Sequence, residues 1–224
     1  DQPAFDPQEI QHLPIEFSGK DSIDKIRELR NYLKSKNYSS IILTALDEIA
    51  WLFNLRGSDI NFNPVFFSYA LITLDEAFLF IGHTGAGNEN KLSKDACTAL
   101  AKDQVKIENY SSVFDRMKTL TGGLKDILIT STCNWKLVEA IGVEKIKSLN
   151  GASGPIETAK SVKNETELKG FRQCHIRDGA ALCRYFAWLE AELNKPNAAL
   201  IDEVDGADRL EAFRVDGEHF KGLS

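Results

Sequence analysis

Short apolar segments typical of β-strands alternate with amphipathic helical segments through the middle of this chain. The β-branched run in SSIILTAL lacks polar alternation, as expected of a strand that is covered on both faces. Later segments predict helix, strand, helix, strand and helix, in the order ENKLSKDACTALAKD, VKIEN, YSSVFDRMKTLT, DILITS and NWKLVEAIG. This alternation predicts an α/β domain, in which helices lie on both faces of a mixed sheet.

Three further patterns predict the elements that precede and follow the strand in SSIILTAL. SIDKIRELRNYLKSKN has helical spacing, with Ser22 as its N-cap. Asp47 is expected to cap a short helix, EIAWLFN, and Gly57 is expected to end that helix in the left-handed conformation. The two apolar runs of VFFSYALITLDEAFLFIG predict a β-hairpin that turns at Asp75 and Glu76.

The pattern changes at two places, which divides the chain into three segments. Residues 1–21 contain three prolines and little periodicity, so we interpret them as a lead-in or linker. Residues 22–160 form the predicted α/β domain. Residues 161–224 begin a second domain, which opens with two helices.

The two C-terminal helices have clear start signals but no partner for their apolar faces. Asn164 and Glu167 form a capping box before a helix of roughly 30 residues, and Asp202 is the expected N-cap of EVDGADRLEAFR. Two helices alone cannot bury both apolar stripes. We expect the α/β domain, a second copy of the chain in a possible homodimer, or a separate fragment to cover the apolar residues Leu168, Phe171, Leu182, Phe186 and Leu189.

Composition and charge exclude several classes of partner. The 43% hydrophobic and 27% charged content suits a globular protein with a sizeable core. A net charge of −6 without a long basic cluster argues against nucleic acid. The apolar runs are too short for a membrane span, and the start of the chain lacks a signal-peptide pattern. The sequence therefore predicts a soluble, cytoplasmic protein, with buried or half-buried free thiols at Cys97, Cys133, Cys174 and Cys183.

The residues alone do not assemble a catalytic or metal-binding constellation. Arg56 follows a predicted buried helix and is a candidate to bind a substrate carboxylate, although a local ion pair with Asp59 is the simpler interpretation. His175 has Asp178 nearby and is interpreted as a packed, hydrogen-bonded histidine. The Gly-rich GHTGAGN lacks the residues of a P-loop and predicts a turn. The aromatic side chains of Trp51, Phe53, Phe66 and Phe67 are interpreted as core or interface packing.

Three blocks in a fixed order resemble a known family. They are TALDEIAWLFNLRGSDINFNPVFFSYALITLDEAFLF, AKSVKNETELKGFRQCHIRDGAALCRYFAWLE and EVDGADRLEAFR. Together they resemble eukaryotic-type, three-domain aminopeptidase P, the cytosolic Xaa-Pro aminopeptidase. The resemblance covers the middle, creatinase-like domain and the start of the catalytic domain. It extends from about Ser18 and is weakest through residues 85–130.

The resemblance implies a metallopeptidase that removes the N-terminal residue from peptides with proline at the second position. In that family a pita-bread catalytic domain holds two divalent metal ions, usually manganese, which bind the attacking hydroxide. The metal ligands of the family are two Asp, one His and two Glu, and all of them lie downstream of Ser224. The resemblance therefore assigns no catalytic residue and no metal ligand to this chain, and implies that the 224-residue chain alone is inactive.

Two interpretations of the function remain open from the sequence. In the first, the chain is a structural portion of an Xaa-Pro aminopeptidase, in which residues 161–224 are the first helices of a truncated pita-bread domain. In the second, the chain is a non-catalytic, pita-bread-related module that binds peptides or partner proteins. The presence or replacement of the five metal ligands in the parent protein distinguishes the two.

Overall fold

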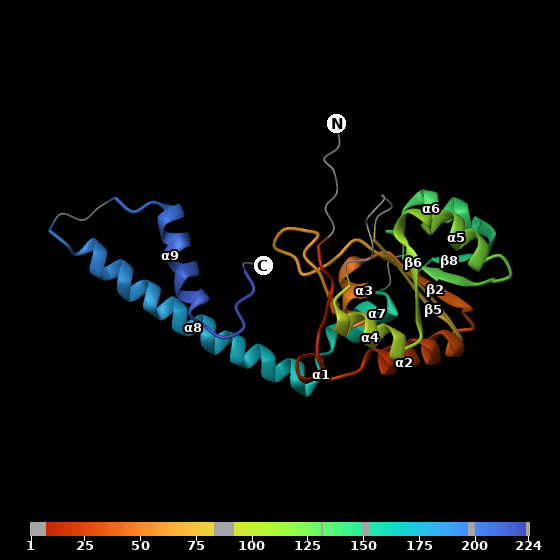
Figure 1. Ribbon diagram of the computed structural model, residues 1–224, viewed down its shortest axis with the longest axis horizontal. Coiled ribbons are helices and arrows are strands. Elements are labelled where there is room, and N and C mark those ends of the chain that lie inside the picture. The colour runs from red at the N-terminus through yellow and green to blue at the C-terminus, as the bar shows by residue number, and fades with distance from the viewer. Residues whose placement is uncertain (1–7, 83–91, 131, 149–152, 197–199, 223–224) are drawn as a thin grey trace. The chain divides into compact units, whose positions relative to one another are not determined.

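The computed structural model describes residues 8–82, 92–130, 132–148, 153–196 and 200–222. The chain divides into two compact units, Asp1–Lys163 and Asn164–Ser224 (Figure 1). Each unit has its own packing, and the two are described separately below.

A six-stranded mixed sheet forms the centre of the first unit, in the order β6-β5-β4-β2-β7-β8. β4 runs antiparallel to β2 and β5, and the other neighbouring pairs are parallel. β2 lies inside the sheet with all four residues buried, as its uninterrupted apolar pattern predicts. The strands are β2 (Ser40–Leu43), β4 (Tyr69–Thr73), β5 (Ala77–Ile81), β6 (Val105–Asn109), β7 (Ile127–Ile129) and β8 (Ile146–Ser148).

Helices cover both faces of this sheet, which confirms the predicted fold class. One core cluster joins the sheet to α2 (Ser22–Ser35), α3 (Leu46–Leu52), α4 (Lys94–Lys102) and α7 (Pro155–Ser161). The other cluster joins the opposite face to α5 (Val113–Leu120) and α6 (Trp135–Ile141), which pack on each other. Figure 1 shows α5 and α6 together at one side of the sheet, with α2, α4 and α7 at the other. Two short 3₁₀ helices, η1 (Tyr110–Ser112) and η2 (Val143–Lys145), complete the connections.

The hairpin and the alternating segments occur where the sequence predicts them. β4 and β5 pair from Tyr69 opposite Phe80 to Ile72 opposite Ala77. The Thr73 hydroxyl accepts hydrogen bonds from the backbone N–H groups of Asp75 and Glu76, at 3.3 and 2.8 Å, and so shapes the turn. The elements that the sequence analysis missed are short: β8 lies at the sheet edge, and α7 starts at Pro155 in a segment interpreted only as the domain end.

Part of the segment interpreted as a lead-in is packed within the first unit. β1 (Gln11–His12) pairs antiparallel with β3 (Leu55–Arg56), and α1 (Ile15–Ser18) follows it. The Leu13 N–H donates to the carbonyl of Asn54 at 2.7 Å, and Ile10 is buried. A two-residue strand is too short to show a periodic pattern. Its hydrogen-bond partners also lie more than forty positions away in the sequence, so no local signal predicts the pairing.

Three predicted helix-end roles, those of Ser22, Asp47 and Gly57, are wrong. Asp21, not Ser22, occupies the N-cap of α2, because the Ser22 hydroxyl donates to the carboxylate of Asp103 instead. Ala45 occupies the N-cap of α3, and Asp47 lies inside the first turn. The left-handed residue after α3 is Asn54, with φ 53°, a conformation that asparagine tolerates better than most residues.

The described residues of the second unit form α8 (Glu165–Leu193) and α9 (Glu203–Val215). Both predicted caps are confirmed: Asn164 and Glu167 form the capping box, and Asp202 accepts from two backbone N–H groups of α9. α9 packs on α8, where the Asp178 carboxylate accepts a hydrogen bond from Arg214 at 2.7 Å. Within the chain, Phe171 is 52% exposed and Phe186 is 61% exposed, so α9 covers only part of the apolar stripe.

Candidate functional site

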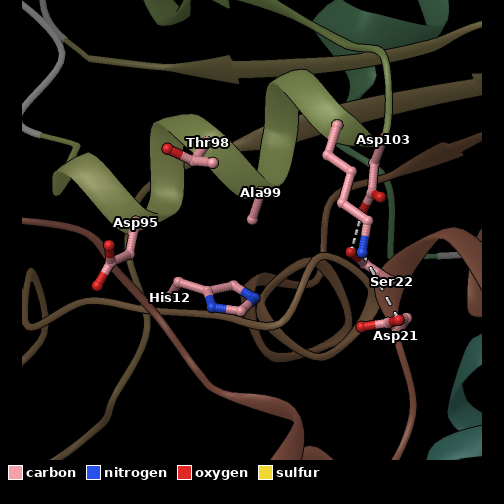
Figure 2. Close-up of a pocket in the computed structure, with 8 residues that line it drawn as sticks. His12, Asp21, Ser22, Asp95, Thr98, Ala99 and Asp103 are labelled. Atoms are coloured by element: carbon pink, nitrogen blue, oxygen red, sulfur yellow. Dashed lines mark hydrogen bonds and ion pairs between the residues drawn. The ribbon is translucent and has the colours of Figure 1, made fainter.

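A polar cavity of about 260 Å³ lies between the start of α2 and one face of α4 in the first unit. Figure 2 shows side chains from three parts of the chain around it. β1 brings His12 to this place because the Ser93 N–H, just before α4, donates to the carbonyl of Ile10 at 2.9 Å. The lining residues are His12, Asp21, Ser22, Asp95, Thr98, Ala99, Lys102 and Asp103.

The charges of this cavity are partly paired with one another. The buried Ser22 hydroxyl donates to the buried Asp103 carboxylate, and Lys102 Nζ lies 3.8 Å from an Asp21 carboxylate oxygen (Figure 2). The lining contains three aspartates and one lysine, so its formal charge is negative. The Ser22 hydroxyl therefore donates to a carboxylate, and this bond does not form the Ser–His pair of a hydrolase nucleophile.

Metal binding is not supported in the part of the chain that the structure describes. No group of three or more His, Cys, Asp or Glu side chains there is arranged to hold an ion. A catalytic zinc ion usually has three protein ligands, and no such group is found among the described residues of the polar cavity.

A second cavity, of about 270 Å³, lies between α2, α3 and α7. Its lining is mainly apolar, with Leu29, Tyr32, Trp51 and Ile156 around it. Lys25 closes one side: its ammonium donates to the Trp51 carbonyl at 2.8 Å and to Asn54 Oδ1 at 2.6 Å. The same Nζ atom lies 4.1 Å from the centroid of the Trp51 ring, which adds a cation–π contact.

Arg56, the candidate for substrate binding, lies in β3 and lines neither of these two cavities. Its Nη1 atom donates to the carbonyl oxygens of Ala50 at 3.2 Å and Leu55 at 2.8 Å. The Asp59 carboxylate accepts from the backbone N–H groups of Gln8 at 3.0 Å and Phe67 at 2.9 Å. These bonds show that Asp59 shapes the loop through backbone contacts.

Two other sequence interpretations are corrected by the structure. His175 is exposed, not packed, and its neighbour Asp178 bonds to Arg214 on α9. Three of the four thiols are exposed, those of Cys97, Cys174 and Cys183, since their helices turn these positions away from the core. Cys133 is partly buried, and burial raises the pKa of its thiol to about 11.

The four aromatic residues that the sequence analysis interprets as core or interface packing are buried to different degrees. Phe53 and Phe66 are fully buried, as expected, and Trp51 and Phe67 are partly buried. The predicted turn in GHTGAGN falls on residues 83–88, outside the described residues.

Sequence reasoning missed Glu48, a buried carboxyl group in the first turn of α3. Its side chain faces α7, and burial raises its pKa to about 7, with the nearby Asp47 and Glu157 raising it further and Lys160 lowering it. The only signal in the sequence was an acidic residue placed directly before the apolar residues Ile49 and Ala50.

Comparison with known families matches residues 1–167 to the creatinase/prolidase N-terminal domain. The chain belongs to this family. The match covers the whole first unit, which includes the six-stranded sheet and both cavities. None of the helices in the described ranges has the length and apolar character that a membrane span requires.

Relatives of this creatinase/prolidase N-terminal domain chain extend the similarity through the second unit. A probable Xaa-Pro aminopeptidase P of Talaromyces stipitatus is 46% identical over 99% of the chain, which covers 34% of that relative. The corresponding protein of Leptosphaeria maculans is 44% identical over 100% of the chain and 37% of the relative. The chain thus spans about a third of the length of the curated relatives it matches.

One solved structure has the same fold across both units. The X-prolyl aminopeptidase of Caenorhabditis elegans, described as a cytosolic enzyme with a di-nuclear active site, matches 99% of the chain with a TM-score of 0.88 and 28% identity. The chain covers 35% of that structure. The Xaa-Pro dipeptidase of Bacillus anthracis, at 15% identity and a TM-score of 0.60, shares the fold.

Proposed function

We propose that the chain is part of an Xaa-Pro aminopeptidase, which removes the N-terminal residue from peptides with proline at the second position. The observation that carries this proposal is the 46% identity to a probable Xaa-Pro aminopeptidase P over 99% of the chain. A shared fold alone would support many activities. Identity at this level through both units supports the proposal that the chain is the corresponding part of a protein of the same kind as this relative.

Within that parent, the chain is a structural, non-catalytic portion. Residues 22–160 are its creatinase-like α/β domain, and residues 161–224 are the first helices of its pita-bread catalytic domain. The break between the two compact units at Asn164 supports this division. The exposed apolar side chains of α8 also support this division, because a helix with such a face usually packs on a further layer.

Two divalent metal ions, usually manganese in this class, would serve the reaction outside the described part of this chain. The di-nuclear active site in the description of the Caenorhabditis elegans enzyme supports two ions for the parent. The described residues of this chain do not fit such a site, because they contain no cluster of three suitable ligands. No catalytic step is assigned to them.

The partners and location follow the same proposal. The parent acts on peptides in the cytoplasm, which the description of the Caenorhabditis elegans protein as cytosolic supports. The net charge of −6 makes nucleic acid an unsuitable partner.

Arg56 is kept as a candidate for binding a substrate carboxylate. The KM of an Arg56→Ala variant of the parent would test that role.

An activity assay tests the proposal. The purified 224-residue chain with manganese is expected not to release the N-terminal residue of an Xaa-Pro peptide, because the described residues hold no metal-ligand set. The parent coding sequence is expected to encode two Asp, one His and two Glu as metal ligands downstream, and the parent to be active. Activity of the short chain would contradict its structural role, and replacement of the five ligands would favour a non-catalytic interaction module.

A further inference from the structure

The contact between α3 and α7 contains a buried carboxyl group. Glu48 lies in the first turn of α3, and its side chain is only 8% exposed. α7 packs against α3, and its Glu157 and Lys160 are the charged residues that act on Glu48 from this side. Asp47, the preceding residue on α3, is the other charge that acts on it.

The lysine of this cluster is already paired with another residue. Lys160 Nζ bonds to the carboxylate of Asp47. A Glu157 carboxylate oxygen accepts from the Gly154 N–H at 3.2 Å and so caps the start of α7. No hydrogen bond to the Glu48 carboxyl group comes from the described residues. Three acidic side chains, those of Asp47, Glu48 and Glu157, therefore lie near one ammonium group, and of the three Asp47 is the one that bonds to it.

The other elements packed on α3 do not supply a charge for Glu48. Lys25 of α2 donates to the Trp51 carbonyl, and Arg56 of β3 donates to the Ala50 carbonyl, both toward the end of the helix. β2 and β4, which also contact α3, carry no acidic or basic side chain. The ionised form of Glu48 is thus buried near two like charges, and the neutral form is favoured.

We propose that the contact between α3 and α7 depends on pH: α7 packs tightly on α3 while Glu48 is protonated and loosens from it when Glu48 is ionised. Loosening exposes the carboxylate to water, which removes the penalty of burying a charge. It also widens the second cavity, since Trp51 and Leu52 of α3 and Pro155 and Ile156 of α7 line its opposite walls. Burial raises the pKa of Glu48 to about 7, which sets the pH range of the change.

The direction with pH follows from linkage. Glu48 binds its proton more tightly in the packed contact than in a solvated one, where the ordinary value of 4.5 applies. Packing is therefore fully supported below about pH 4.5 and weakens as the pH rises to about 7. Linkage uses the pKa of Glu48 in solvent, 4.5, and in the packed contact, about 7. It predicts that the equilibrium constant for loosening α7 from α3 is about tenfold larger at pH 8.5 than at pH 6.

Hydrogen exchange of the whole 224-residue chain tests the proposal. The amides of residues 157–161 in α7, corrected for intrinsic exchange, are expected to lose about tenfold protection between pH 6 and pH 8.5. Glu48→Gln, which keeps the shape of the neutral acid, should show equal protection at both pH values. Glu16→Gln, an exposed glutamate of α1, serves as the matched control and should retain the wild-type change.

A direct titration keeps the test independent of the variants. The ¹³Cδ signal of Glu48 in the wild-type chain is expected to titrate near pH 7. A midpoint near 4.5, or an equal loss of protection in wild type and Glu48→Gln, would overturn the proposal.

Discussion

Gly57 is required by a close approach of two chain segments. A Cβ atom at this position would lie 2.8 Å from the Cβ of Phe66 and 3.2 Å from the carbonyl oxygen of Val65. Neither atom can rotate away, because one is a backbone atom and the other is attached directly to the backbone. Phe66 is also fully buried, so its movement would disturb the core. The glycine was expected for a different reason, namely a left-handed backbone at a helix end.

Gly57→Ala is expected to lower the free energy of unfolding by about 1–3 kcal/mol, the usual cost of forcing an extra group into a packed site. The midpoint of urea unfolding measures this change. Gly123→Ala is the matched control, because a Cβ there meets no atom within 4 Å. Equal midpoints for the two variants would show that the segments can separate without cost.

Local signals identified α8 by its capping box and missed α7. The capping box of α8 uses Asn164 Oδ1, which accepts from the Glu167 N–H at 3.0 Å, and Glu167 Oε2, which accepts from the Asn164 N–H at 2.8 Å. α7 has only seven residues, and an isolated helix of this length is not stable in water. Its position depends on Ile156, which is buried in the core of the first unit.

Asn164→Ala is expected to destabilise the first turn of α8 by about 1 kcal/mol, because the variant removes the acceptor for an unpaired backbone N–H. Hydrogen exchange of residues 166–170 should increase about fivefold as a result. Asn164→Asp retains the acceptor and should exchange like wild type. An unchanged rate in Asn164→Ala would mean that tertiary contacts, not the cap, hold this turn.

The two compact units differ in how well the chain covers their apolar surface. The first unit buries two apolar clusters on opposite faces of its sheet. The second unit has two helices, and α8 leaves Phe171, Ile176 and Phe186 more than half exposed. An exposed apolar stripe of this kind usually marks a surface that another layer covers.

The isolated 224-residue chain is therefore expected to self-associate through α8, and its mean mass in sedimentation equilibrium should rise with concentration. The double variant Phe171→Ser, Phe186→Ser should remain monomeric. Phe62→Ser is the control, since Phe62 is 69% exposed but belongs to the first unit. A chain that stays monomeric at all concentrations would rule out a second copy of the chain as the cover of this apolar stripe.

The sequence by itself determined the elements whose signals are local. The apolar run of β2, the hairpin turn after Thr73, the capping boxes and the helix–strand alternation each depend on neighbouring residues, so their patterns are visible in one dimension. Together they were sufficient for the α/β class and for the mixed sheet. The resemblance to aminopeptidase P also arose from continuous blocks.

Only the tertiary structure decided which side chains meet across the chain. The Ser22 hydroxyl lies at a helix start but bonds to Asp103, 81 residues away. Lys25 is 4% exposed, although lysine is usually solvated, because Trp51 and Asn54 supply its acceptors. Glu48 is buried because α7 folds back over α3, more than a hundred residues later in the chain. Burial and charge pairing depend on such long-range contacts, which a local pattern does not encode.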